Sequence, residues 1–361
     1  MNEKIKRELI KIVNIETDYY DGAYLVYSKN IIRIIIKSIY KVIRKYGNVK
    51  CLYSIKANLN NEIISFIAES IDGFDVASWN EYQKVKIYNN KIISLSGYAF
   101  SGEQIENSVK KNNFDFISIN QFKRVSKQIS GEKIGIRICS RISNLDRIDE
   151  TNSRFGFVYE IDSKELEQIC IKNNIIVKRI HVHSGEKNIR NLMYCVTEVK
   201  KWLADFSTIE EVNFGGGWDY IIDMNQFEDV INKIANEFSD KLVFIEPGSL
   251  IVRKAGILVS RVIDYSVSPS NDGTVVLDSS SFNLSSWFKP KVVAIKRKGL
   301  PIPLIKYDLC GNTCYEEDIF QKNQSKPIGI GDIIYLYPTG AYYNSTYRKL
   351  HDLDFPKEIL I

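Results

Sequence analysis

The sequence predicts an α/β fold in which a (β/α)8 TIM barrel is followed by a C-terminal β-domain, and three observations support this. Eight short, almost continuously apolar runs occur between about residues 50 and 248, and such runs are typical of parallel strands buried on both faces. Helical patterns alternate with these runs. After residue 248 the helical patterns stop, and short strands follow between Gly, Pro, Asn and Asp turns. The alternative for the first part is an open doubly wound sheet.

The expected barrel strands, in chain order, are VKCLYSI, GFDVA, KIISLSG, DFISIN, KIGIRIC, VKRIHVHS, IEEVNFGGG and KLVFIEPG. The helical patterns between them cover residues 62–70, 81–88, 102–111, 121–128, 164–172, 191–206 and 225–238. Eight such units in about 200 residues lie near the lower size limit of a barrel. The earlier segment IIRIIIKSIYKVI contains Arg33, Lys37 and Lys41. These charges indicate an amphipathic helix and exclude a membrane span.

The expected strands of the β-domain lie within ILVSRVIDYSV, TVVLDSS, KVVAIKR, PIPLIKYDL and DIIYLYPTG. We therefore assign residues 25–248 to the barrel, and residues 1–24 together with 249–361 to the β-domain. The sequence leaves open whether the chain is a complete protein or one part of a longer, bifunctional polypeptide.

The composition is that of an ordinary globular protein, with 44% hydrophobic and 26% charged residues among 361. A net charge of +5 is too small to favour nucleic acid. The first residues, MNEKIKRELIKIV, carry charges throughout and do not resemble a secretory signal. We therefore expect a cytoplasmic protein that acts on a small molecule, with neither a nucleic-acid nor a membrane partner.

The six cysteines form no CxxC pair, which favours free thiols in a reducing compartment. Cys310 and Cys314 could join His181 and His183 as metal ligands. However, the two pairs lie in different kinds of segment, and their spacing is not a usual zinc pattern. We expect no metal.

The predicted strand ends carry an unusual set of side chains. In a barrel, chemistry gathers where the strands end at the C-terminal face. The residues at these ends are Lys56, Asp75, Gly97, Asn120, Arg137, His183, Gly215–Gly217 and Glu246. The set includes an amine, carboxylates, a guanidinium, an imidazole and a triple glycine, and this convergence is a stronger signal than any one member.

Three of these strand ends predict one kind of cofactor. A partly desolvated Lys56 amine could form a Schiff base, although a single lysine at a strand end more often reaches into solvent. The glycines of VNFGGGWDY could bind a phosphate through their backbone N–H groups. Glu246 could hold a proton on a ring nitrogen, and either His181 or His183 could stack on a flat cofactor while the other lies in the core. Pyridoxal phosphate requires such an amine, anion site and carboxylate.

From about Tyr24 to Tyr347 the chain resembles the fold-type III pyridoxal-phosphate decarboxylases, which include ornithine, diaminopimelate and carboxynorspermidine decarboxylases. The segments that carry the resemblance are YSIKAN, GFDVASWNE, HVHSG, FGGGWD, IEPGS, CGNTCYEED and GAYYNS. The family fold is a barrel plus a β-domain, as in alanine racemase and ornithine decarboxylase, which agrees with the pattern. The resemblance also implies a homodimer with shared active sites, in which the partner contributes the cysteine segment.

The resemblance implies a role for each matching residue. Lys56 is expected to form the Schiff base, and Cys314 is expected to be the second catalytic residue. We expect cofactor contacts from Lys56, Asp75, Arg137, His183, Gly215, Gly216, Gly217, Glu246 and Tyr342. We expect substrate contacts from Glu186, Asp318 and Tyr315.

Three departures from the family pattern concern the substrate. Ser249 follows EPG where many relatives have an Arg that can grip a second carboxylate, which argues against diaminopimelate. Glu186 stands where many relatives have Ser or Thr, as in the carboxynorspermidine branch. We expect Glu186 to face a substrate amine, since a carboxylate beside a phosphate is unfavourable. Tyr315 follows Cys314 where many relatives have Glu.

The resulting prediction is a pyridoxal-phosphate-dependent decarboxylase of polyamine or specialised-metabolite biosynthesis. Its substrate is expected to be an amino acid with one carboxylate, or an aminocarboxypropyl-type group as in microcin C-type antibiotic pathways. An amino-acid racemase is the second interpretation, but racemases of this type tend to have Arg where Glu246 stands. A non-catalytic pyridoxal-phosphate carrier is the third, but such carriers resemble the barrel alone.

Overall fold

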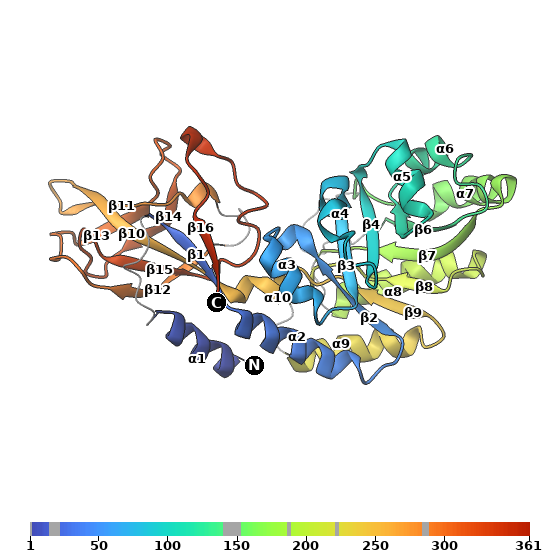
Figure 1. Cartoon of the computed structure of the whole chain (residues 1–361), viewed down its shortest axis with the longest axis horizontal. Coiled ribbons are helices and arrows are strands. Elements are labelled where there is room, and N and C mark those ends of the chain that lie inside the picture. The colour runs from blue at the N-terminus through green and yellow to red at the C-terminus, as the bar shows by residue number, and fades with distance from the viewer. Residues whose placement is uncertain (1, 14–21, 140–152, 186–188, 221–223, 284–288) are drawn as a thin grey trace. The chain divides into compact units, whose positions relative to one another are not determined.

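The computed structural model describes residues 2–13, 22–139, 153–185, 189–220, 224–283 and 289–361 (Figure 1). The chain divides into two compact units. The barrel unit comprises residues 36–56 and 64–250, and the β-unit comprises residues 1–35, 57–63 and 251–361. Each unit is described by itself below.

The barrel unit is built around a closed parallel barrel of eight strands (Figure 1). The strands are β2 (Val49–Ser54), β3 (Gly73–Ser78), β4 (Ile92–Ala99), β5 (Asn113–Phe116), β6 (Lys133–Ile138), β7 (Ile176–Val182), β8 (Glu211–Asn213) and β9 (Leu242–Ile245). Each strand pairs with the next, and β2 pairs with β9 to close the barrel. The predicted (β/α)8 barrel is confirmed, and the open doubly wound sheet is excluded.

Helices lie before and between the strands, and all of them except α10 are at or near predicted positions. They are α2 (Lys29–Ile43), which begins in the β-unit, α3 (Asn61–Ala68), α4 (Trp79–Val85), α5 (Gly102–Val109), α6 (Ile119–Val125), α7 (Tyr159–Asn173), α8 (Ile189–Asp205), α9 (Met224–Glu237) and the short α10 (Ser249–Val252). Ser78, Ser101 and Ser118 cap α4, α5 and α6 by accepting a hydrogen bond from a backbone N–H in the first turn. Helix α7 begins five residues before the predicted start, because its first turn buries no apolar side chain.

The β-unit contains helix α1 (Asn2–Val13) and an eight-stranded sheet in which β12, β15, β10, β11, β13 and β14 are neighbours in that order. The strands are β1 (Tyr24–Tyr27), β10 (Gly256–Val267), β11 (Asp272–Leu277), β12 (Lys291–Lys296), β13 (Lys306–Cys310), β14 (Ile319–Gln324), β15 (Ile333–Tyr337) and β16 (Lys357–Leu360). Strand β1 pairs with both β10 and β16. The hydroxyl of Tyr335 on β15 donates to the carbonyl oxygen of Val13 at the end of α1.

Three strands of the β-unit were not predicted. Strand β1 pairs within this sheet, whereas the expected boundary at residue 25 would give most of it to the barrel. Strands β14 and β16 lie at sheet edges and bury few side chains, so their apolar pattern is weak. The predicted strand PIPLIKYDL is shorter in the structure and begins at Lys306, after its two prolines.

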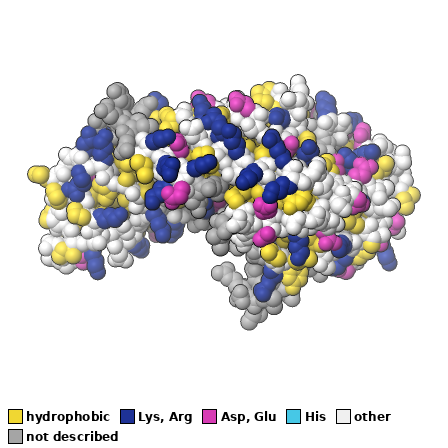
Figure 2. All heavy atoms as spheres, turned by 90° about the horizontal axis from the view of Figure 1, so that it is seen from below, with side chains coloured by type: hydrophobic (Ala, Val, Ile, Leu, Met, Phe, Trp, Pro, Cys, Tyr) yellow, Lys and Arg dark blue, Asp and Glu magenta, His cyan; other side chains and the backbone are white. Residues whose placement is uncertain are grey.

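Charged side chains are dispersed over one face of the molecule. Figure 2 shows Lys and Arg side chains over much of one face, with acidic and hydrophobic side chains between them. Among the described helices, none is both long enough and apolar enough to cross a bilayer.

Candidate active site

Lys56 lies just beyond β2, in a 3-10 turn formed by Ile55–Ala57. Its Nζ is 3.2 Å from Oδ2 of Asp75 on β3, and its side chain is 42% exposed. The Asp75 carboxylate is buried, and the same oxygen accepts a hydrogen bond of 2.5 Å from Ser54 Oγ. The structure therefore holds the predicted amine, just beyond the end of β2, against a buried carboxylate. Asp75 is not at the end of its strand as expected. It is the third residue of β3 and pairs with Ser54, the last residue of β2.

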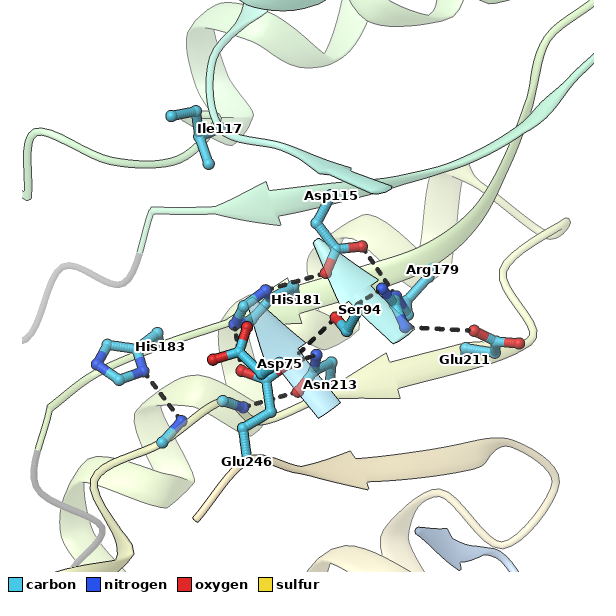
Figure 3. Close-up of polar contacts among 12 residues, drawn as sticks. Asp75, Ser94, Asp115, Ile117, Arg179, His181, His183, Glu211, Asn213 and Glu246 are labelled. Atoms are coloured by element: carbon cyan, nitrogen blue, oxygen red, sulfur yellow. Dashed lines mark hydrogen bonds and ion pairs between the residues drawn. The ribbon is translucent and has the colours of Figure 1, made fainter. Parts of the chain in front are cut away.

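Glu246 follows β9 and is buried. Its Oε1 accepts hydrogen bonds from Asn213 Nδ2 at 2.5 Å and from Ser94 Oγ at 3.3 Å, as Figure 3 shows. Its Oε2 lies 3.6 Å from His181 Nε2. Burial and then the charge of Asp75 raise the pKa of the Glu246 carboxyl, against smaller lowering effects from His181 and Asn213. Hydrogen bonds thus fix the position of the Glu246 carboxyl group, and the charges of its neighbours act on its pKa.

The triple glycine packs against His183. Gly215 has a φ of +64°, and a Cβ there would lie 2.8 Å from His183 Nδ1, so this position requires glycine. The backbone N–H of Gly215 donates to Asn213 Oδ1 at 2.9 Å, and that of Gly216 donates to His183 Nδ1 at 3.1 Å. Gly217 also has a positive φ, of +90°. The backbone of the glycine turn therefore lies against the His183 imidazole, and there is no room for a side chain at Gly215.

The two histidines of β7 and its C-terminal extension occupy different environments. His181 is buried, with its Nδ1 3.0 Å from Asp115 Oδ2 on β5. His183 lies beyond the end of the strand and is half-buried beside the glycine turn. His181 is therefore the histidine of the core, and His183 is the one placed at the barrel mouth (Figure 3).

Arg137 is the penultimate residue of β6, and its guanidinium carbon lies 4.7 Å from the ring centre of Phe155. Burial lowers the pKa of Arg137, while the negative charges of Glu246 and Asp75 oppose that change. The run DFISIN predicted that Asn120 ends a strand, and this prediction is wrong. Strand β5 ends at Phe116, and Asn120 lies exposed in α6.

In the β-unit, the predicted catalytic cysteine and its neighbour are both exposed. The backbone N–H of Cys314 donates to Nε2 of His351 at 3.1 Å. The Tyr315 ring is 48% exposed and stacks on the His351 ring at a centroid distance of 5.3 Å. The thiol of Cys314 and the ring of Tyr315 are thus available at the surface of this unit, on a segment held by His351.

Asp318, expected to contact the substrate, has its carboxylate hydrogen-bonded inside the β-unit. It is 2% exposed. Its Oδ1 accepts hydrogen bonds from the N–H and hydroxyl of Ser281, both at 2.7 Å. Its Oδ2 accepts from the N–H and hydroxyl of Thr313, at 3.1 and 2.6 Å. Asp318 therefore joins two loops and offers no open oxygen to a substrate.

Tyr342, expected near the phosphate, has a φ of +60°. Its backbone N–H donates to the carbonyl oxygen of Ala57, the residue that follows Lys56, at 2.7 Å. Glu186, expected to contact the substrate, lies outside the described residues.

The sequence patterns did not identify four polar residues inside the barrel, of which two donate hydrogen bonds to Glu246 and two support those contacts. They are Ser94, Asp115, Arg179 and Asn213, and all of them are buried. A signal was present, because each interrupts an apolar strand at a position that faces inward. Arg179 and His181 stand two residues apart on β7 and therefore point to the same face.

Comparisons with known proteins agree with this geometry. Residues 32–253 match the family model described as "Pyridoxal-dependent decarboxylase, pyridoxal binding domain". Diaminopimelate decarboxylase of Archaeoglobus fulgidus is 23% identical over 335 residues, covering 83% of this chain and 78% of that protein. Antizyme inhibitor 2 of Xenopus laevis is also 23% identical, covering 85% and 75%.

Solved structures show the same fold. The arginine decarboxylase of Paramecium bursaria Chlorella virus, bound to agmatine, has a TM-score of 0.80 at 18% identity, covering 98% of this chain and 100% of that chain. Diaminopimelate decarboxylase of Helicobacter pylori, complexed with L-lysine, has a TM-score of 0.78 at 20% identity, covering 99% and 94%. The match over most of the barrel, together with the lysine, glycine turn and glutamate placed above, shows that the chain belongs to the pyridoxal-dependent decarboxylase family.

Proposed function

We propose that the chain is a pyridoxal-phosphate-dependent decarboxylase that removes the α-carboxylate of an amino acid or of an aminocarboxypropyl-type group. The observation that carries the proposal is the joint placement of Lys56, Asp75 and Glu246 at the C-terminal mouth of one barrel. The ion pair of Lys56 with Asp75 supports it, as does the electrostatic effect of both residues on the pKa of Glu246. Membership of the family gives independent support.

The residues present fit pyridoxal phosphate. Lys56 supplies the amine for covalent attachment, Glu246 supplies the carboxylate for the ring nitrogen, and the glycine turn supplies a close backbone approach for the phosphate. The N–H of Gly216 donates to His183 Nδ1. Phosphate binding by the N–H of Gly216 would therefore require His183 to give up this hydrogen bond.

When bound, pyridoxal phosphate supplies an aldehyde for the substrate amine and a ring that accepts the electron pair left by the departing carboxylate. The chain's own residues provide position and protons. Asp75 orients the Lys56 amine and balances its charge. Glu246 holds a proton at the ring nitrogen, and either Cys314 Sγ or Lys56 Nζ returns a proton to the substrate α-carbon.

The proposal extends to assembly and substrate. We propose a homodimer in the cytoplasm, in which one protomer's Cys314 segment completes the active site of its partner. The exposure of Cys314 and Tyr315 supports this, because both remain available for such a contact. Because the Asp318 carboxylate accepts hydrogen bonds from two loops, we propose that Tyr315 is the residue of this segment that contacts the substrate. Ser249 in place of Arg favours a substrate with one carboxylate, in polyamine or antibiotic biosynthesis.

The decisive experiment removes the Lys56 amine. The Lys56→Ala variant is expected to lose the visible absorbance of the bound cofactor and all CO2 release. Lys50→Ala, at the opposite end of β2 from Lys56, should keep both. A Lys56→Ala protein with full colour and turnover would end the proposal.

The same assay separates the decarboxylase from a racemase. Free amino acids, carboxylated polyamines and aminocarboxypropyl conjugates are incubated with the protein, and CO2 release is compared with exchange of enantiomers. We expect CO2 release from one of these classes. Enantiomer exchange without CO2 would favour a racemase, although Glu246 argues against it because racemases of this type tend to have Arg at that position.

A further inference from the structure

The barrel interior holds a set of polar side chains that the proposed function does not use. We call it the interior network, and its members are Ser94, Asp115, Arg179, His181 and Asn213. They come from β4, β5, β7 and β8, and they lead from the middle of the barrel to Glu246 (Figure 3). Buried polar groups are costly unless they are paired, so an arrangement of this size calls for an explanation beyond stability.

One arm of the network runs from Arg179 to His181. Arg179 is 2% exposed, and its Nε donates to Asp115 Oδ1 at 2.8 Å. The other oxygen of Asp115 lies 3.0 Å from His181 Nδ1. Burial raises the pKa of Asp115, but Arg179 and His181 lower it by more. The pKa of Asp115 is therefore below its ordinary value. Asp115 is therefore an ionised acceptor, and His181 Nδ1 must carry the hydrogen of this contact.

The same arm continues from His181 to Glu246. His181 Nε2 is buried, has no hydrogen-bond partner among the described residues, and lies 3.6 Å from Glu246 Oε2. If Nε2 and Oε2 both lacked a proton, two lone pairs would face each other between two buried side chains. One proton between them removes this repulsion, and it can reside on either atom.

The second arm reaches the other oxygen of Glu246. Arg179 Nη2 donates to Ser94 Oγ at 3.0 Å, and Ser94 Oγ lies 3.3 Å from Glu246 Oε1. Asn213 Nδ2 donates to the same Oε1 at 2.5 Å. Each oxygen of Glu246 is thus linked to the buried guanidinium of Arg179, Oε2 through His181 and Asp115 and Oε1 through Ser94, while Asn213 adds an independent hydrogen bond to Oε1.

We propose that His181 and Glu246 share one proton, and that Arg179 and Asp115 are positioning residues that hold His181 for this purpose. The inference rests on the proposed function, in which Glu246 faces a protonated ring nitrogen. Glu246 accepts that hydrogen bond most strongly as a carboxylate, and in that state the shared proton lies on His181 Nε2. The charged groups that act on Glu246 are Asp75, His181, Lys56, Arg137 and Arg179.

The chain is well suited to a direct test because it contains three histidines. Ring nitrogens of 15N-histidine-labelled, cofactor-free protein are followed by NMR across a pH titration, and the signals are assigned with His183→Gln and His351→Gln. We expect the pH midpoint of proton loss from His181 Nε2 to fall by at least one unit in Glu246→Gln, and likewise in Asp115→Asn. An unchanged midpoint in Glu246→Gln would overturn the shared proton.

A matched control and a second variant keep the test decisive. Asp72→Asn removes a carboxylate just before β3 that accepts hydrogen bonds from the hydroxyl of Tyr40 and the N–H of Cys51, and it should leave the His181 midpoint unchanged. If Asp115→Asn does not fold, Ser94→Ala removes the second arm and should also lower the midpoint, by less than one unit. No change in Ser94→Ala would contradict the role of Arg179 in both arms.

The cofactor-loaded protein gives a separate readout. Asp115→Asn is expected to bind as much cofactor as the wild type, while the pH dependence of its visible absorbance shifts by about one unit; an unshifted profile would refute the positioning role. Because the NMR experiment needs neither cofactor nor substrate, its result stands even if no substrate releases CO2. A failure of the proposed function and a failure of the shared proton are therefore distinguishable.

Discussion

Replacing Arg179 by Met is expected to destabilise the barrel unit by about 3–5 kcal/mol, the usual effect of removing one partner of a buried ion pair. Asp115 is fully buried and loses its 2.8 Å contact with the guanidinium. Ser94 loses a donor, and Glu211 loses the cation that lies 3.9 Å away. The side-chain volumes are similar, so little of the loss should come from a cavity.

The loss should depend on pH in a defined direction. In the wild type the pKa of Asp115 is lowered, so its stabilising effect is complete above the unfolded pKa of about 3.9 and disappears as the pH falls through the folded value. Without Arg179, burial dominates and raises the pKa of Asp115. The variant then gains stability as the pH falls from neutral toward 4, and the difference between the two proteins shrinks.

Urea unfolding followed by tryptophan fluorescence measures the effect, since Trp202 is buried in the barrel unit. The double variant Arg179→Met with Asp115→Leu serves as the control. It removes both charges and should be more stable than Arg179→Met alone. A loss below about 1 kcal/mol at pH 7, or a loss of equal size at pH 4, would refute the reasoning.

Three other expectations follow from single positions. Gly215→Ala should weaken cofactor binding at least tenfold in an absorbance titration, because the new Cβ would stand 2.8 Å from His183 Nδ1; Gly22→Ala, also at positive φ but with nothing within 4 Å, should not. Asp318→Asn should destabilise the β-unit by about 1–3 kcal/mol in chemical denaturation, and a neutral result would contradict its role between two loops. Cys314→Ala should slow product formation or change the product while the cofactor absorbance stays intact; normal turnover and product would remove its proposed role.

The sequence predicted the barrel because a parallel strand buried on both faces has a strong local signature. VKCLYSI and KLVFIEPG are mostly apolar, and each leads to a proposed site residue, Lys56 after the first and Glu246 within the second. Serine caps and amphipathic patterns located most helices within a few residues. Strands β14 and β16 escaped prediction because edge strands bury little, so their residues carry no clear alternation.

The positions of Lys56, Glu246 and the glycine turn just beyond strands were predictable, because each follows a strong local strand pattern. The candidate site was not predictable where a residue's partners are remote in the chain. Asp318 receives hydrogen bonds from Ser281, which is 37 positions away, and sequence spacing gives no information on such a pair. Arg179 and Asp115 are 64 positions apart, so only the closed barrel brings them together.

The side chain of Asn213 joins the glycine turn to Glu246. Its amide is bifunctional: the oxygen receives the N–H of Gly215, and the nitrogen points to Glu246. A carboxylate of the same shape could keep the first contact but would turn the second into repulsion. One side chain thus sets the spacing between the phosphate end and the pyridine end of the proposed cofactor site. A ligand group that moves the glycine turn would therefore also change the hydrogen bond from Asn213 to Glu246.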